Sequence, residues 1–321
     1  MVLYSLDLLR SHVTGTIDLL LCSVSFEGRC RSVADNMDNS LISRVAIAQN
    51  QNHAIYHKDN PDYLCQKFSG KCGGVILDTD KPILSADGIW KELSDIFQGS
   101  AKRVLIDIST FTHEALLIIL RAAFLLARPS DEIRFAYVPA EYSVGDEPQD
   151  KWLSKGIREI RSVVGYPGEL LPSRKIHLIV LVGFETERAR ALIEAYEPAF
   201  ISLGYSTEVG STSKENYTAS NYFHAKMMTL FPNSNKFEFS ATNFAETAKV
   251  LKSVAQGQTE LNTVIAPLNT KLSTIGSALA AIADDTIQLC YAQAELYNYE
   301  NYSKPSASCY LFTIPGLGKA L

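Results

Sequence analysis

The sequence predicts an α/β protein made of two tandem Rossmann-like parallel-sheet units that arose by internal duplication. The chain has 321 residues, which suits two domains of about 150 residues each. Apolar runs of strand length alternate with amphipathic segments of helical length, and this alternation is typical of a parallel sheet covered by helices. The same order of strands and helices occurs twice along the chain.

The strands of both halves are predicted from continuous apolar runs, which are typical of strands buried on both faces of a parallel sheet. In half one we expect strands at 17–25, 43–49, 75–78, 102–109 and 132–138, with helices after the first strand, at 88–98 and at 112–127. In half two we expect strands at 175–184, 199–206, 262–269 and 285–292, with helices at 185–198, 245–255 and 272–283. Residues 223–231 and 236–241 are expected to flank a turn.

Local matches support the duplication. Phe-Glu with a nearby arginine follows the first strand of both halves, a Thr stands at the end of the last strand but one in both, and a Tyr, an Ala and a Glu recur in the last strand. We therefore expect unit one at 1–144, a linker at 145–174 with a helix around 151–163, and unit two at 175–321.

Composition excludes several classes of protein. The net charge of −5 argues against an extended nucleic-acid surface, which needs a surplus of Lys and Arg. The N-terminal residues do not resemble a signal peptide, and the longest apolar stretches are too short to span a bilayer. The six cysteines do not have zinc-site spacing and are expected to be reduced. We expect a cytoplasmic protein without a metal site.

Polar and charged residues follow the predicted strands at their carboxyl ends, where ligands bind in open parallel sheets. The candidate ligand-binding residues are Glu27, Arg29, Ser109, Thr110, Glu185, Arg188, Asn269, Thr270 and Lys271. The cations are expected to contact phosphate, and the Ser, Thr and Asn side chains to orient the ligand in a cleft between the halves. An alternative is purely structural, since Ser, Thr and Asn favour helix N-caps and the glutamates can pair with the arginines across the two halves.

Two common nucleotide-binding motifs are absent. No Gly-x-x-x-x-Gly-Lys-Ser/Thr loop and no Gly-x-Gly-x-x-Gly sequence follows any predicted strand. The sequence therefore indicates no resident cofactor. Lys271 is the most specific candidate, because it stands at a strand-to-helix turn where a cation can meet a phosphate held by backbone amides.

The segments 106–117, IDISTFTHEALL, and 266–281, APLNTKLSTIGSALAA, resemble the strand-to-helix motif of CRISPR-associated Rossmann-fold (CARF) sensor domains. Two such units in one chain resemble the duplicated, SAVED-like sensors of antiviral defence systems. The resemblance implies a sensor that binds a cyclic nucleotide signal and acts through an effector protein or a homo-oligomer, or that cleaves the signal itself. Half one departs from the pattern, because Phe111 stands where half two has Lys271.

Two other functions remain open. His224 and Lys226, followed by Ser240 and Asn243, resemble the His-x-Lys motif of phospholipase D-like phosphodiesterases, in which the His is the nucleophile and the Lys binds phosphate. The expected acidic residue is missing, with Phe231 near its place, and only half two has such a motif, so this enzyme would have to dimerise. The third possibility is a non-catalytic scaffold subunit of a defence complex.

Overall fold

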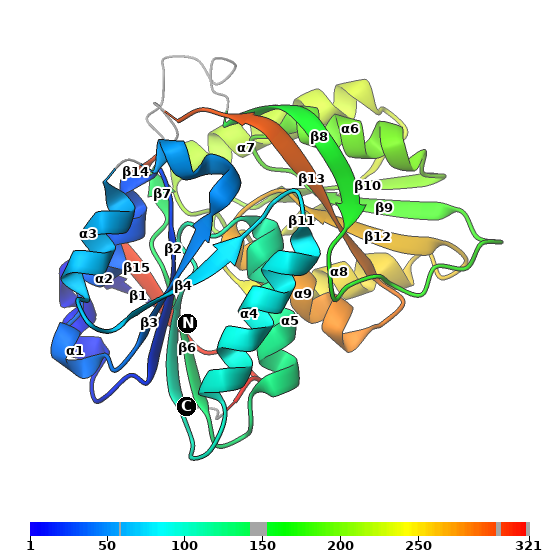
Figure 1. Ribbon diagram of the computed structural model, residues 1–321. Coiled ribbons are helices and arrows are strands. Elements are labelled where there is room, and N and C mark those ends of the chain that lie inside the picture. The colour runs from blue at the N-terminus through cyan, green and yellow to red at the C-terminus, as the bar shows by residue number, and fades with distance from the viewer. Residues whose placement is uncertain (58, 142–152, 300–302, 319–321) are drawn as a thin grey trace. The chain divides into compact units, whose positions relative to one another are not determined.

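The computed structural model describes residues 1–57, 59–141, 153–299 and 303–318. The chain forms two compact units, one of residues 1–143 with 303–321 and the other of residues 144–302 (Figure 1). Each unit has a mostly parallel sheet with helices packed on it, so the predicted α/β class with two Rossmann-like units is confirmed. Within the described ranges, no helix is both long and apolar enough to cross a membrane.

The first unit contains a mixed sheet with the strand order β1-β15-β6-β5-β2-β3-β4. The strands are β1 (Val2–Ser5), β2 (Leu19–Val24), β3 (Val45–Asn50), β4 (Cys72–Leu77), β5 (Arg103–Asp107), β6 (Glu132–Tyr137) and β15 (Ser308–Phe312). Strands β2 to β6 pair in parallel, whereas β15 is antiparallel to both of its neighbours. A two-stranded ribbon joins β7 (Ala140–Glu141) to β14 (Lys304–Pro305).

Helices cover both faces of this sheet (Figure 1). They are α1 (Leu9–His12), α2 (Ser32–Asp35), α3 (Asn60–Lys67), α4 (Pro82–Ile96) and α5 (His113–Leu126), with short 3₁₀ turns η1 (Leu6–Leu8), η2 (Gly28–Arg31), η3 (Asn39–Leu41) and η4 (Gln51–Tyr56). All six residues of β2 are buried, as expected for a strand covered on both faces. Helix α5 begins where the Thr112 side chain accepts a hydrogen bond from the Ala115 amide.

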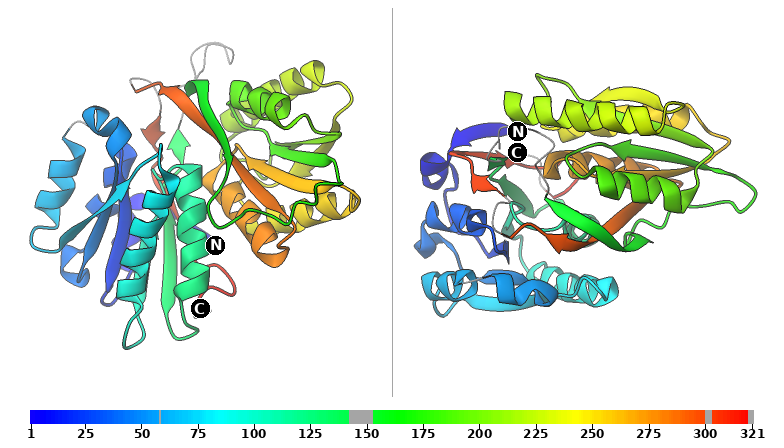
Figure 2. Two further views of the ribbon diagram at one scale, coloured as in Figure 1. Left: turned by 45° about the vertical axis from the view of Figure 1, so that its right-hand side comes forward. Right: turned by 90° about the horizontal axis from the view of Figure 1, so that it is seen from above.

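The second unit has the strand order β11-β10-β9-β12-β13-β8. Its strands are β8 (Ser154–Ser162), β9 (Ile176–Leu181), β10 (Phe200–Ser206), β11 (Asn235–Phe239), β12 (Asn262–Pro267) and β13 (Gln288–Tyr297). Its helices are α6 (Thr186–Tyr196), α7 (Lys214–Leu230), α8 (Phe244–Gln256) and α9 (Lys271–Ala283). Helices α6 and α7 lie on one side of this sheet and α8 and α9 on the other (Figures 1 and 2).

Both units share a six-strand topology. In each, the five parallel strands lie in the order third, second, first, fourth and fifth, followed by one antiparallel strand, and β1 extends the first sheet beyond β15. The chain order therefore reverses between the first and fourth strands, which are β2 and β5 in the first unit and β9 and β12 in the second. In open α/β sheets this switch point is where ligands bind.

The antiparallel strand of each sheet comes from the part of the chain that follows the parallel strands of the other sheet. Strand β8, which comes after β6 in the sequence, pairs with β13, whereas β15, which comes after β13, pairs with β6. The expected domain boundaries therefore change: the last described residues complete the first unit, and 153–174 belong to the second. A unit two that continues to residue 321 would leave the β6 edge without its partner.

Two expected elements are wrong. Residues 154–162 were expected within a linker helix, but they form β8, an edge strand whose charged side chains are largely exposed; the first part of that expected linker, 145–152, lies outside the described residues. Residues 223–231 were expected to flank a turn but belong mostly to α7, where Ala219, Phe223 and Met227 form one buried stripe at helical spacing. Short runs of mixed polarity fit either period, which explains both errors.

The exchange predicts which unit loses stability when the C-terminal segment is removed. Deleting residues 303–321 takes β15 from beside β6 and uncovers buried side chains of the first unit, although the deletion follows the second unit in sequence. Hydrogen exchange followed by mass spectrometry should show faster exchange in β5 and β6 and unchanged protection in β9 and β12. Faster exchange mainly in the second unit would contradict this assignment.

Candidate functional site

The structure places the predicted ligand-binding residues at the two switch points. Glu27 and Arg29 follow β2, and Ser109 and Thr110 follow the neighbouring β5. In the second unit, Glu185 and Arg188 follow β9, while Asn269, Thr270 and Lys271 follow the neighbouring β12. The loops that the sequence singled out therefore adjoin within each unit.

In the first unit, the charged candidates bind each other. The Arg29 guanidinium donates to Glu27 Oε2 at 2.8 Å and to the carbonyl of Val138 at 2.9 Å, and both charged side chains are buried. Ser303 also donates to Glu27 Oε2. The pair holds the loop after β2 against the end of β6. Glu27 and Arg29 therefore pair with each other, as the structural alternative expects. The pair forms within one unit and not across the two halves.

Ser109 and Thr110 are likewise engaged. Ser109 Oγ donates to Asp107 Oδ1 at 2.5 Å and accepts from the Val138 amide at 3.0 Å. Thr110 Oγ1 donates to the carbonyl of Ser23 in β2 at 2.8 Å. Phe111, which matches Lys271 in the sequence comparison, lies before the Thr112 cap of α5 and is only 1% exposed. This rim is a closed network that links the ends of β2, β5 and β6.

Asp107 belongs to this network, although sequence reasoning missed it. It ends strand β5 directly after the apolar residues 104–106 and is 3% exposed. Burial raises the pKa of its carboxyl group to about 6, against the lowering effect of the Ser109 hydrogen bonds and of Arg29. An acidic residue at the carboxyl end of an apolar strand was the available signal.

The second unit repeats the buried ion pair. The Arg188 guanidinium donates to Glu185 Oε2 at 2.6 Å and lies 5.1 Å from the centre of the Tyr291 ring in β13. Glu185 also accepts a hydrogen bond from Ser154 in β8. As in the first unit, the pair ties the loop after the first strand to the fifth strand. The Glu–Arg pairs of both units therefore act as positioning residues.

Beyond this pair, the rim of the second unit is rich in hydroxyl groups. Thr207 Oγ1, after β10, accepts from the Gly210 amide at 3.0 Å, and Thr242 Oγ1, after β11, donates to the Gly210 carbonyl at 3.2 Å. Thr270 Oγ1, after β12, donates to the Ala241 carbonyl at 2.5 Å. Three strand-end loops are thereby joined by small polar side chains.

Three helices begin at these loops. Side chains cap each of them: Ser213 accepts from the Asn216 amide in α7, Asn243 from Glu246 in α8, and Thr270 from Ser273 in α9. Helices α8 and α9 lie close, since a Cβ at Gly276 would come within 2.8 Å of Thr247 Cβ. A helix N-terminus carries partial positive charge and amide donors, so this rim favours anions.

Asn269 and Lys271 complete the rim. Asn269 Nδ2 donates to the Val182 carbonyl at 2.7 Å, which fixes the end of β12 to the end of β9. Gly183 permits this approach, because a Cβ there would lie 2.1 Å from the Leu268 carbonyl oxygen. Lys271 is the first residue of α9 and half-buried, so its cation belongs to the same loop as the Thr270 cap.

The phosphodiesterase candidates do not form one site. His224 and Lys226 are two positions apart in helix α7, so one is buried and the other exposed. His224 Nε2 lies 3.3 Å from the Leu203 carbonyl in the middle of β10, and burial lowers its pKa. Ser240 Oγ accepts from the Asn243 amide at 3.0 Å and thereby shapes the loop before α8. In the described part of the chain, no group of His, Cys, Asp and Glu side chains is arranged to hold a metal.

The close approach at Gly183 predicts a stability effect. Gly183→Ala places a methyl group against backbone atoms of Leu268 and Asn269, so the loops after β9 and β12 must separate. We expect the free energy of unfolding to fall by about 1–3 kcal/mol, measured by urea denaturation. Gly28→Ala, in the corresponding loop of the first unit, is the matched control because a Cβ there meets no atom within 4 Å. Equal effects of both substitutions would contradict the prediction.

Asp107 predicts a pH dependence of stability. Its pKa is about 6 in the folded protein and about 3.9 in an unfolded chain. Between these values the native state holds the proton and the unfolded state does not, so this stabilisation is complete below pH 4 and is lost as the pH rises through 6. Asp107→Asn should flatten the Tm profile between about pH 4 and pH 6, with exposed Asp87→Asn as the control. If Tm depends on pH as steeply in Asp107→Asn as in the native protein, Asp107 is not the cause of that dependence.

Comparison with known proteins does not assign a family. No family model and no curated protein matches this sequence. The crystal structure of the cytoplasmic domain of a prokaryotic cation chloride cotransporter is similar at 10% sequence identity with a TM-score of 0.26, covering 89% of this chain and 98% of that chain. A short-chain dehydrogenase/reductase, a glucose/ribitol dehydrogenase from Brucella melitensis, is similar at 8% identity with a TM-score of 0.23, covering 85% and 92%. TM-scores this low carry no argument about ligand or activity.

Proposed function

We propose that this protein is a sensor whose second unit binds a small phosphate-containing ligand, with a cyclic nucleotide as the class implied by its resemblance to CARF and SAVED-like domains. The observation that carries the proposal is the rim of the second unit, where the loops after β10, β11 and β12 join at the N-termini of α7, α8 and α9 beside Lys271. This rim lies at the switch point of the sheet, where open α/β sheets bind ligands.

The chemistry of the rim suits a phosphate ester. Helix N-termini direct amide donors and partial positive charge outward, and Lys271 adds a full charge at one of them. Hydroxyl and amide side chains can hydrogen-bond to phosphate or sugar oxygens. The whole chain has a net charge of −5, so attraction for an anion has to be local.

The two units have different roles in this proposal. The first unit has no lysine at this place: α5 begins with His113, as α9 begins with Lys271, and Phe111 is buried before the Thr112 cap. The arginines of both units are held in ion pairs with Glu27 and Glu185. Asn269, Thr270 and Lys271 therefore form the ligand-contacting set, while the other predicted residues position the loops around the switch points.

Binding without turnover fits this rim better than hydrolysis. His224, the nucleophile of the phosphodiesterase alternative, lies against β10 in the middle of α7 rather than at the strand-end loops. A sensor of this kind acts through a partner, either an effector protein or another copy of the chain, and the resemblance would place it in antiviral defence.

Lys271→Ala tests the site. Thermal-shift and calorimetric titrations would use inorganic phosphate, mononucleotides and cyclic di- and trinucleotides, because a ligand that binds only the folded state raises Tm. We expect at least one nucleotide to stabilise the native protein and Lys271→Ala to weaken its binding by about tenfold or more, as for loss of a charged hydrogen bond. Lys249→Ala, exposed on α8, is the control and should bind normally.

Either of two results would contradict the proposal. Unchanged affinity in Lys271→Ala would remove this rim as the binding site. Consumption of the bound nucleotide by the native protein, abolished in His224→Ala, would favour the phosphodiesterase alternative. No stabilisation across the whole panel would leave the scaffold alternative as the better description.

A further inference from the structure

Strand β4 forms an open edge of the first sheet. It ends the strand order and, among the described strands, pairs only with β3. The Val45 amide donates to the Lys71 carbonyl at 2.9 Å, and the register pairs Val45 with Cys72. In a parallel ladder, alternate residues direct both backbone groups to the same side. The N–H and C=O groups of Cys72, Gly74 and Ile76 therefore face away from β3.

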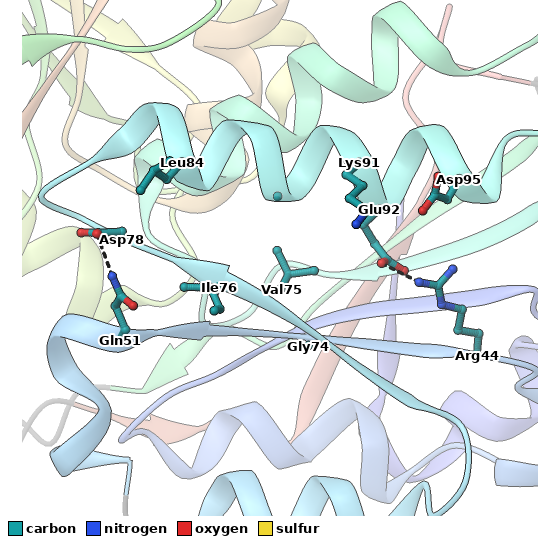
Figure 3. A pocket seen from close by; sticks show the side chains of 11 residues that line it. Arg44, Gln51, Gly74, Val75, Ile76, Asp78, Leu84, Lys91, Glu92 and Asp95 are labelled. Atoms are coloured by element: carbon teal, nitrogen blue, oxygen red, sulfur yellow. Dashed lines mark hydrogen bonds and ion pairs between the residues drawn. The ribbon is translucent and has the colours of Figure 1, made fainter.

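A groove of about 610 Å³ runs between β4 and α4 (Figure 3). Gly74, Val75 and Ile76 line it from the strand, and Leu84, Gly88, Lys91, Glu92 and Asp95 line it from one side of the helix. A Cβ at Gly74 would meet no atom within 4 Å, so the strand side is open there. Gly88 lets α4 approach the strand, since a Cβ there would lie 3.5 Å from the Ile76 carbonyl oxygen. Its volume lies within the range of about 300–1,000 Å³ typical of ligand sites.

Strand β4 lacks two of the features that usually prevent strand pairing. Open edges are commonly protected by proline, by charged side chains or by a covering helix or loop. Strand β4, with the sequence CGGVIL, contains no proline and no charge. Ile76 is 64% exposed, and Leu84 on α4 is 53% exposed. Apolar side chains and unpaired backbone groups therefore lie along the same edge.

Glu92 indicates the charge of the occupant. Its side chain is only 10% exposed, and its Oε2 accepts from the Arg44 guanidinium at 2.7 Å. Its Oε1 is buried and has no hydrogen-bond partner among the described residues. Asp95 lines the groove at the same end. A buried carboxylate oxygen without a donor is costly, so a cationic N–H donor is the group that would satisfy it.

We infer that the groove between β4 and α4 binds an extended segment of a partner protein as an added β-strand, with a Lys or Arg side chain on Glu92 and apolar side chains against Ile76 and Leu84. Added strands gain affinity from backbone hydrogen bonds and specificity from alternate side chains. A second copy paired through β4 fits less well, because that strand brings no cation to Glu92. This inference does not depend on the ligand proposed for the second unit.

The test uses the intact protein and a phage-displayed library of random linear octapeptides. We expect enrichment of sequences with one fixed Lys or Arg and apolar residues at alternate positions from it. In hydrogen exchange read by NMR, the synthetic form of an enriched peptide should protect the amides of Gly74 and Ile76, which face the open edge. Fluorescence anisotropy then gives its Kd.

Two variants separate backbone pairing from charge. Gly74→Pro removes a donor that faces away from β3, so the ladder to β3 is kept, and peptide binding should weaken by about tenfold. Glu92→Gln keeps the shape of the side chain and should weaken peptides that carry the basic residue by about tenfold, but not their Ala-substituted forms. Asp87→Asn, exposed on α4 and outside the groove lining, is the matched control and should leave Kd within about twofold.

Three outcomes would overturn the inference. The first is a library that yields no basic, alternating consensus. The second is an enriched peptide whose affinity is unchanged in both Gly74→Pro and Glu92→Gln, or whose protected amides lie elsewhere. The third is a native dimer in sedimentation velocity that becomes monomeric in Gly74→Pro, which would make a second copy the occupant. If Gly74→Pro melts well below the native protein, Glu92→Gln alone decides between these results.

Discussion

The buried ion pair after the first strand of each unit is the interaction on which the rest of the rim depends. In the first unit Arg29 reaches from Glu27 to the Val138 carbonyl, and in the second Arg188 lies between Glu185 and the Tyr291 ring. Each pair connects the loop after the first strand to the fifth strand, across the switch point. Because removing one member of a buried pair leaves an uncompensated charge, these loops have little freedom to move apart. The neighbouring strand-end loops, with their helix caps and hydroxyl groups, pack beside these fixed loops.

The strands and the positions of the rim residues could be predicted from the sequence, because buried parallel strands are continuous apolar runs and the loops after them have distinct polar residues. The partners of those residues could not. Glu27 and Arg29 suggested a phosphate site, yet their ion pair is closed by Val138, which is 109 residues away from Arg29 in sequence. The sequence also could not predict which sheet β8 and β15 join, because the polarity pattern of an edge strand does not depend on the sheet to which it belongs. Asp107 was overlooked for a related reason: a single acid in an apolar strand has meaning only once its burial is known.

The two units use one topology for different surfaces. The first unit has a closed rim, with Phe111 buried before the Thr112 cap of α5, and an open sheet edge at β4 beside a groove. The second has a hydroxyl-lined rim with Lys271, while its β8 edge is lined with charged side chains. Charges along an edge discourage strand pairing, whereas the CGGVIL sequence of β4 does not. Small changes in the same two places, the strand-end loops and the outermost strand, are enough to distinguish the copies.

The reciprocal exchange of β8 and β15 bears on how such a chain could have evolved. Copying a self-contained unit and joining the copies end to end would give each sheet a sixth strand from its own half. Here each half supplies that strand to the other sheet. This is the connectivity expected if the ancestor was a homodimer whose subunits swapped a terminal strand before the two genes were fused. In such a history, fusion would make the swap permanent, and the copies could then diverge in sequence while neither could be lost without leaving the other sheet incomplete.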